Sequence, residues 1–113
     1  MQKRLRLQKK KEFNLVFKHG KVTANHQFVI HHKTCIDTNQ FRFGISASKK
    51  IGNAVTRNNI RRRIKEIVRN MEDRIIVNID IICIVRKPAL DLNHLELKRS
   101  IIHVLSRARL IRH

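Results

Sequence analysis

The sequence predicts an α+β fold, a two-layer sandwich in which helices pack on a small mixed sheet. Amphipathic helical stretches alternate with strand-like stretches rich in Ile, Val and Phe. A strand, a strongly basic helix and another strand follow one another, which suggests a crossover unit on an open sheet. The 113 residues contain 3 Gly and 1 Pro, with no repeat and no linker, so residues 1–113 read as one domain.

The N-terminal part of the chain predicts a helix preceded by a tail. Residues 1–9 form a basic arm, which we expect to be mobile. The first helix is expected over residues 10–19, because Phe13 and Phe17 are one helical turn apart and share a face. Gly20 follows as the residue that ends this helix.

Two strands are expected next, over residues 26–33 and 41–47, joined by a loop or hairpin connection over residues 34–40. The second strand alternates strictly. Its core face holds Phe41, Phe43, Ile45 and Ala47, and its other face, which is not apolar enough to be buried and is free to meet a ligand, holds Arg42, Gly44 and Ser46.

The C-terminal half predicts helix, strand and helix. Asn53 is a suitable N-cap for a helix that reaches Met71. One helical stripe of this segment is apolar: Ile60, Ile64, Ile67, Val68 and Met71. A central, buried strand is expected over residues 75–85 and ends at Arg86-Lys87-Pro88. The last helix is expected over residues 92–110, with a core stripe of Leu95, Ile101, Ile102, Leu105 and Ala108.

Composition excludes several classes of protein. Lys plus Arg is 26 and Asp plus Glu is 8, a formal charge of 26 − 8 = +18. A hydrophobic fraction of 42% excludes an acidic disordered chain, and 2 cysteines exclude a disulfide scaffold and favour a reducing compartment. The longest apolar run, residues 81–85, is too short to span a membrane, and no signal peptide is visible. The charge favours a nucleic-acid partner, with an anionic membrane surface a distant second.

The strongest functional signal is the basic block from Lys49 to Arg69, which holds eight cations and one acid, Glu66, for a net charge of 8 − 1 = +7. A solvated helical face normally mixes Glu with Lys, whereas this block lacks the pairing acids. Its cations are mostly Arg, whose planar fork suits phosphate. The helix start after Ser46, Ser48 and Gly52 also favours an anion. We therefore expect RNA or DNA binding here.

Aromatic residues give a second signal, and catalytic signals are poor. Phe13, Phe17 and Phe28 lie near basic residues and are able to stack on unpaired bases, although Phe28 fits a core position at least as well. His31 and the Arg42 face are candidates for the floor of a groove.

His31, His32 and Cys35 lack a fourth metal ligand and the usual paired spacing. With no carboxylate pair, nucleophile motif or phosphate loop, the chain reads as a binder, or as a subunit whose catalyst lies elsewhere.

One motif resembles a known family. The run FGISASKKIGNAVTRN at residues 43–58, continued by IRRRIK at residues 60–65, closely resembles the signature of the protein subunit of bacterial ribonuclease P. Three flanking segments agree in order and spacing: LQKKKEFNLVFKHG at 7–20, VTANHQFV at 22–29 and IICIVRKPA at 81–89. The resemblance covers nearly the whole chain.

The resemblance implies a ribonucleoprotein of the bacterial cytoplasm that removes the 5′ leader from precursor tRNA. The implied partners are the catalytic RNA and precursor tRNA, with no membrane and no small-molecule substrate. The RNA subunit would carry the chemistry with Mg²⁺ held in the holoenzyme, and the protein itself would have no catalytic residue, metal or cofactor. The implied fold is ribosomal-protein-like, with a left-handed crossover through the basic helix where the usual rule is right-handed.

The family's contact positions were matched to this sequence and combined with the cations of the basic block. The expected RNA contacts then form two sets. The set for the catalytic RNA is Lys49, Lys50, Asn53, Arg57, Asn58, Arg61, Arg62, Lys65 and Arg69. The set for the precursor-tRNA leader is Phe13, Phe17, Val29, His31, Arg42, Ser46 and Arg86. Three positions depart from the family. Asn59 and His26 stand where a basic residue is common, so that a phosphate contact at Asn59 is weakened or moved to Arg63, and His31 stands where Tyr is common.

Other classes remain open on composition. A ribosomal or general RNA-binding protein without a role in tRNA processing is the main alternative, and the block at residues 43–58 argues against it. A stand-alone nuclease lacks a catalytic constellation. A DNA-binding module would be expected to show a duplicated or dimerising half, and none is visible.

Overall fold

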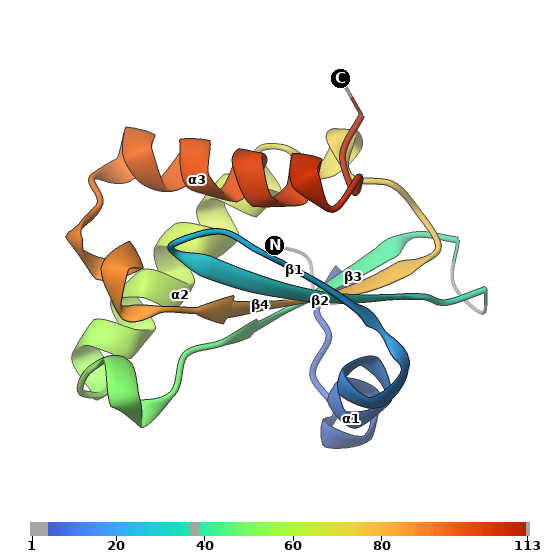
Figure 1. Cartoon of the computed structure of the whole chain (residues 1–113), viewed down its shortest axis with the longest axis horizontal. Helices are drawn as coiled ribbons and strands as arrows, with labels where there is room; N and C mark the ends of the chain where they lie inside the picture. Colours follow the sequence, from blue (N-terminus) through green and yellow to red (C-terminus); the bar gives the residue numbers. More distant parts are fainter. Residues whose placement is uncertain (1–4, 37–38, 113) are drawn as a thin grey trace.

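A four-stranded mixed sheet with helices on both faces organises the molecule (Figure 1). The computed structural model describes residues 5–36 and 39–112. The strands, in spatial order, are β1 (Lys21–Ala24), β2 (Phe28–Thr34), β4 (Ile79–Val85) and β3 (Phe41–Ser46). β4 pairs antiparallel with β2 and parallel with β3, so it is central, as its Ile-rich sequence predicts. The α+β fold class is confirmed.

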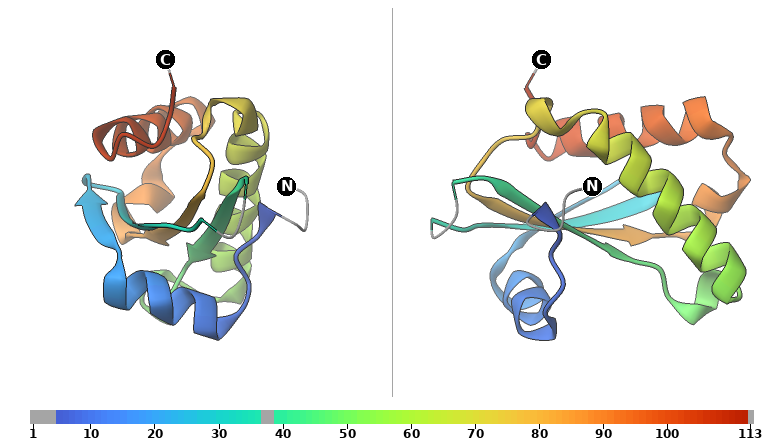
Figure 2. Two further views of the ribbon diagram at one scale, coloured as in Figure 1. Left: turned by 90° about the vertical axis from the view of Figure 1, so that its right-hand side faces the viewer. Right: turned by 180° about the vertical axis from the view of Figure 1, so that it is seen from behind.

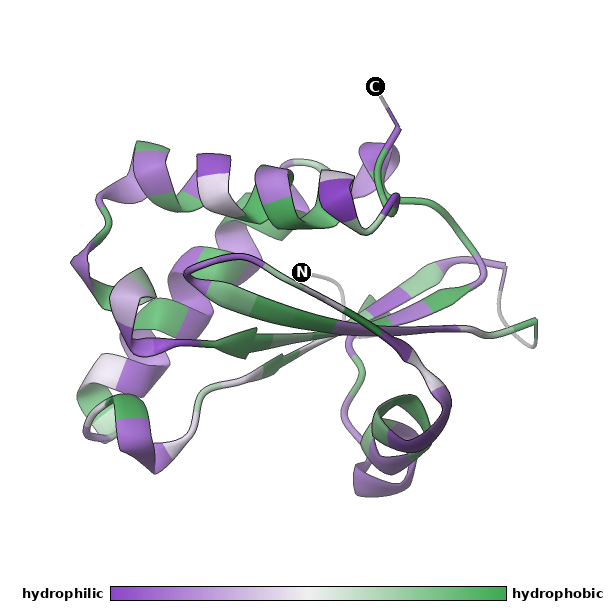
Figure 3. Ribbon diagram, in the orientation of Figure 1, coloured by the Kyte–Doolittle hydropathy of each residue, from purple (hydrophilic) through white to green (hydrophobic). Residues whose placement is uncertain are grey.

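The main core lies between the sheet and two helices, α2 (Ala54–Arg69) and α3 (His94–Arg107). Both helices cover the same face of the sheet (Figure 2). The predicted stripe of α2 is buried, and its helix begins after Asn53, whose Oδ1 accepts the Thr56 N–H at 2.9 Å. In Figure 3 the sides of α2 and α3 that face the sheet are the hydrophobic ones.

The opposite face of the sheet carries α1 (Lys10–His19), which has the predicted bounds. Its anchor is Val16, 1% exposed, which packs with Leu7 and Ile82 in a second, smaller core. The N-terminal segment that precedes α1 packs against the sheet through alternate residues of Leu5-Arg6-Leu7. Leu5 and Leu7 are buried, and the Leu7 N–H donates to the Phe43 carbonyl at 3.0 Å on the outer edge of β3. From Leu5 onward this stretch is thus packed against the sheet, and residues 1–4 lie outside the described part.

The structure adds one strand and decides how two others are connected. β1 was not predicted, because it is a four-residue edge strand whose side chains are largely exposed and give no alternating signal. Of the two connections expected after β2, a loop or a hairpin, the structure has the loop, because β2 and β3 both pair with β4 and do not pair with each other. Residues 37 and 38 of that connection lie outside the described part of the chain.

The C-terminal elements are shorter than predicted. β4 begins at Ile79 rather than at residue 75, since a short 3₁₀ turn (Glu72–Arg74) precedes Ile75, which is buried and bridges to Ile111. α3 begins at His94, and Leu95 is 55% exposed, so its place in the core stripe was wrong and Leu97 takes it.

Candidate nucleic-acid interface

α2 presents a cationic side opposite its buried stripe. Asn58, Arg62 and Arg69 are exposed on it, and Arg57 is half-buried. Arg61 and Lys65 are half-buried along the border with β3 and with the segment Leu5-Arg6-Leu7 that precedes α1. Asn53 caps this helix through its side-chain oxygen. The fold therefore brings the predicted set on this helix to one surface.

Most of these cations have no counter-charge. Glu66, the one acid of the block, pairs with Arg69 at 2.6 Å on the exposed surface, and the two groups shift each other's pKa in opposite directions, lowering that of Glu66 and raising that of Arg69. Within the described residues, no carboxylate forms an ion pair with any cation of the block other than Arg69. A polyanion is the partner that relieves this repulsion.

Arg61 is held in place by the backbone of the β3–α2 connection. Its guanidinium donates to the Ala47 carbonyl at 3.1 Å and to Asn58 Oδ1 at 3.2 Å. Arg57 Nε is buried and has no hydrogen-bond partner among the described residues. Pre-positioned guanidinium groups lose less side-chain freedom when they contact phosphate.

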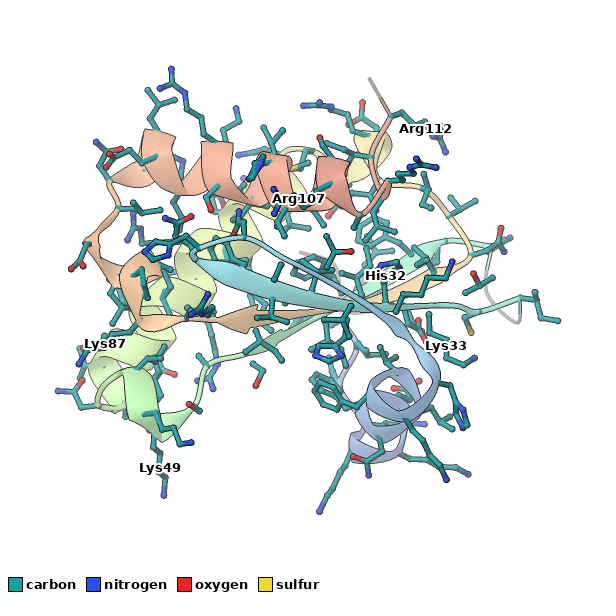
Figure 4. All side chains as sticks on the ribbon, viewed as in Figure 1. His32, Lys33, Lys49, Lys87, Arg107 and Arg112 are labelled. Atoms are coloured by element: carbon teal, nitrogen blue, oxygen red, sulfur yellow. The ribbon has the colours of Figure 1, made fainter. Side chains whose placement is uncertain are left out.

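The carboxyl ends of β3 and β4 add cations at one end of the sheet. Because these strands are parallel, the segments that follow them emerge together: Lys49 and Lys50 in a 3₁₀ turn (Lys49–Ile51), and Arg86 and Lys87 after β4. Figure 4 shows Lys49 and Lys87 at this same end of the molecule. The four side chains are exposed, and they extend the cationic surface beyond α2.

The sheet face beside α1 is the surface predicted to hold the leader, and we call it the groove. Phe17 is 41% exposed and meets His31 edge-to-face, with ring centroids 4.9 Å apart. Val29 and Ser46 flank Ile84 across three strands and are half-buried beside it, and Ile84 is a residue that the sequence analysis missed. Arg86, also predicted for the leader, follows β4, and its guanidinium donates to the Asn25 carbonyl at 3.4 Å. Burial lowers the pKa of His31, whose Nδ1 has no partner among the described residues.

Phe13 explains the glycine of β3. A Cβ on Gly44 would lie 2.5 Å from Phe13 Cζ, so only glycine leaves room for this ring over the strand. The ring centroid of Phe13 is 6.3 Å from that of Phe17. Phe28 is fully buried in the main core, which is the alternative that the sequence left open for it.

Arg42 is occupied by carboxylates. It donates two bonds of 2.8 Å to Asp80 of β4, and a third to Glu12 of α1. The hydrogen bonds to Asp80 hold the pKa of Arg42 well above its usual value. Arg42 thus links α1 to the sheet at the edge of the groove, and its contact with a leader stays a prediction.

A cavity of about 300 Å³ joins the α2 surface to the α1 side of the sheet. Its polar lining comes from Arg6 and Gln8 of the N-terminal segment and from Arg61 and Lys65 of α2, and Phe13 and Gly44 complete it. Arg6 is a site residue that the sequence analysis missed. The leucines on either side of it are the signal that could have found it, because they dock the segment.

Two of the three positions that depart from the family pattern, Asn59 and His26, lie away from this surface, whereas His31 lies against Phe17. Asn59 and Arg63 share a small cavity with Leu90 near the start of α3, and Arg63 donates to the Leu92 carbonyl at 2.9 Å. Arg63 is therefore tied to the opposite side of α2 from Arg61. His26 is exposed in the turn between β1 and β2.

Within residues 5–36 and 39–112, no three His, Cys, Asp or Glu side chains are grouped to hold a metal ion. In the same residues no helix is long and apolar enough to cross a membrane.

A mixed α+β sheet with a cationic helix and an aromatic groove at its edge defines a small RNA-binding protein. A sequence model of the family Ribonuclease P matches residues 1–109. The ribonuclease P protein component of Bacillus cereus (strain AH187) is 44% identical over 96% of this chain and 94% of its own. The chain belongs to the ribonuclease P protein family.

Solved structures agree with this assignment. The Staphylococcus aureus RNase P protein superposes with a TM-score of 0.89 at 40% identity, over 96% of this chain and 98% of that one. The RNase P protein from Thermotoga maritima gives a TM-score of 0.83 at 29% identity, over 90% of this chain and 96% of that one.

Proposed function

We propose that this chain acts as the protein component of ribonuclease P, binding the catalytic RNA through α2 and the 5′ leader of precursor tRNA through the groove beside α1. One observation carries the proposal: the cationic helix α2 borders β3 on one side, the Phe13 ring of α1 lies over Gly44 of the same strand on the other, and a cavity lined by Arg6, Arg61 and Phe13 connects them. One RNA surface and one single strand can therefore be held at the same time.

On the α2 side, the guanidinium groups supply sequence-independent phosphate contacts. Each neutralised phosphate releases condensed counterions, which favours binding at moderate salt. The two Lys of the 3₁₀ turn extend these contacts around the end of the sheet. Arg86, which follows β4 at the same end, is assigned to the leader.

On the groove side, Phe17 and His31 offer two rings to unpaired bases. Stacking on an exposed ring tolerates any base, because every base has a π face. A leader of variable sequence needs this kind of contact. Val29 and Ile84 form an apolar floor, and Ser46 offers a hydroxyl beside it.

The chemistry belongs to the RNA subunit in this proposal, and Mg²⁺ is held with that RNA. The protein binds and orients the two RNAs, and its cations offset part of their mutual repulsion, so that less Mg²⁺ is needed to bring them together. Because precursor tRNAs of bacteria are made in the cytoplasm, the proposal places the protein there.

Phe17→Ala tests the groove. We expect it to weaken binding of precursor tRNA to the holoenzyme by about tenfold, because one stacking contact is worth about 1–3 kcal/mol. Binding of mature tRNA, which has no leader, should be unchanged. The matched control is Leu15→Ala, an exposed apolar residue of the same helix. A precursor-to-mature affinity ratio that Phe17→Ala leaves at the wild-type value would contradict the groove assignment.

A further inference from the structure

A second concave, basic site lies far along the sheet from the ends that carry Lys49 and Lys87. It is an open cavity of about 410 Å³ between the β1–β2 pair and the C-terminal end of α3. Its ionisable lining is entirely basic: His19, Lys21, His32, Lys33 and Arg109. In Figure 4, His32 and Lys33 mark this end of the sheet.

These cations have no counter-charge. Among the described residues, none of Lys21, Lys33 and Arg109 forms an ion pair with a carboxylate. Three permanent positive charges therefore line one concavity together with two imidazoles. Such an arrangement raises the local concentration of anions.

His32 is the least solvated polar group of the cavity wall. It is 9% exposed, and its Nε2 is buried without a hydrogen-bond partner among the described residues. Burial and the charges of Lys21 and His31 lower its pKa. A buried imidazole with no partner is costly, and an anion in the cavity supplies an acceptor for a ring N–H and offsets the neighbouring charges.

The backbone at Arg109 has a conformation that is uncommon for a residue with a side chain. Arg109 follows the last turn of α3 with φ 61°, in the left-handed region where helices commonly place glycine. Its N–H donates to the Ser106 carbonyl, and the next N–H, of Leu110, donates to Leu105. The turn would form with glycine at lower conformational cost, so an arginine at this position points to a use for its side chain.

We propose that this cavity binds a phosphate group of an RNA strand and forms a third RNA contact, separate from the α2 surface and the groove. The net charge supports a cationic site outside α2, because residues outside the block at 49–69 carry 18 − 7 = 11 of the 18 excess positive charges. The assignment to RNA rests on the proposed function, whereas the phosphate site itself does not.

The first arm of the test uses inorganic phosphate and the free, full-length protein. We expect phosphate to shift the NMR signals of the His32 ring saturably and to raise its pKa. Arg109→Gly should weaken this binding about tenfold while keeping the fold, since glycine suits the left-handed φ. Lys98→Ala, an exposed cation of α3 outside the cavity, is the control of equal charge and should leave it unchanged. Three outcomes would overturn the site: no shift of the His32 signals, a shift that does not saturate, which would mean an adventitious ion only, and an equal effect of the two variants on phosphate binding.

The second arm asks whether RNA is the source of the phosphate. With a bacterial ribonuclease P RNA, Arg109→Gly should reduce affinity and flatten its salt dependence, and Lys98→Ala should do so less. Unchanged RNA affinity in Arg109→Gly would overturn the assignment to RNA. Loss of precursor-tRNA cleavage is not the readout of either arm, so failure of this site and failure of the proposed function are distinguishable.

Discussion

At the scale of single residues, Arg42 decides how α1 sits on the sheet. Its fork holds Asp80, whose side chain is 8% exposed, and the same guanidinium reaches Glu12 on α1. Polar side chains on this strand face suggested a ligand site, but two carboxylates already occupy the donors. The pair between Arg42 and Asp80 is the shielded half of the network, and the pair with Glu12 is the more solvated half.

The two halves should differ in their effect on stability. We expect Asp80→Asn to lower the free energy of unfolding by about 3 kcal/mol, because it leaves a partly buried guanidinium without its bidentate partner. Glu12→Gln should cost about 1 kcal/mol, because its carboxylate is more exposed to solvent. Urea unfolding of the two variants measures both values. Equal losses of unfolding free energy in the two variants would contradict the prediction that the more buried ion pair contributes more to stability.

His31 and His32 link stability to pH. Burial lowers the pKa of both below the ordinary 6.5, with Lys21 and His31 adding to the effect at His32. As the pH falls below about 6.5, the unfolded chain takes up these protons before the folded chain does. Stability is therefore highest above that pH, and it decreases on acidification toward the lowered pKa values.

Urea unfolding at about pH 7.5 and about pH 5.5 tests this linkage. We expect a lower free energy of unfolding at the acidic pH, and a smaller decrease in His31→Tyr, which removes one of the two titrating groups. His94→Gln, a change at an exposed histidine, serves as the control. A decrease of the same size in wild type and His31→Tyr would contradict the assignment to His31.

At the scale of elements, the sequence of α2 places apolar side chains on one side of the helix and cations on the other. Its apolar stripe packs on the sheet, and Arg61 and Lys65, four residues apart, lie along the border with β3. The cap at Asn53 fixes where the helix begins and therefore which side chains reach that border. A one-residue shift of this start would rotate the cations away from β3.

Arg61→Ala combined with Arg62→Ala tests the α2 surface. We expect weaker binding to a bacterial ribonuclease P RNA and a log–log salt slope smaller by about 1.4–1.8, since each of the two lost phosphate contacts removes about 0.7–0.9. The matched control is Lys98→Ala with Arg99→Ala, two exposed cations of α3. If the control flattens the slope as much as the α2 pair does, net charge and not this surface governs binding.

The elements that could be predicted from the sequence are those with strong local periodicity. α1, α2 and the central β4 follow from spacing, and so do the cationic face and the aromatic pair. β1, the docking of the segment around Arg6 and the place of β3 beyond β4 depend on pairing between distant segments, which no local pattern encodes. The role of Gly44 also needed the structure, because its contact is with a ring on another element.

At the scale of the whole molecule, the sheet separates two surfaces and β3 connects them. α2 lies on one face and α1 on the other, and the N-terminal segment runs along the outer edge of β3 between them (Figure 2). In the proposed function, an RNA held on α2 would therefore be next to a strand held in the groove, and this adjacency is how the protein would assist cleavage by the RNA subunit.

Cleavage of precursor tRNA at low, near-physiological Mg²⁺ tests this central claim most directly. The three reactions contain a bacterial ribonuclease P RNA alone, the protein alone, and the two together. The account predicts removal of the 5′ leader only in the mixture. Cleavage by the protein alone would contradict it in favour of a stand-alone nuclease, and tight RNA binding without stimulation would contradict it in favour of a general RNA-binding protein.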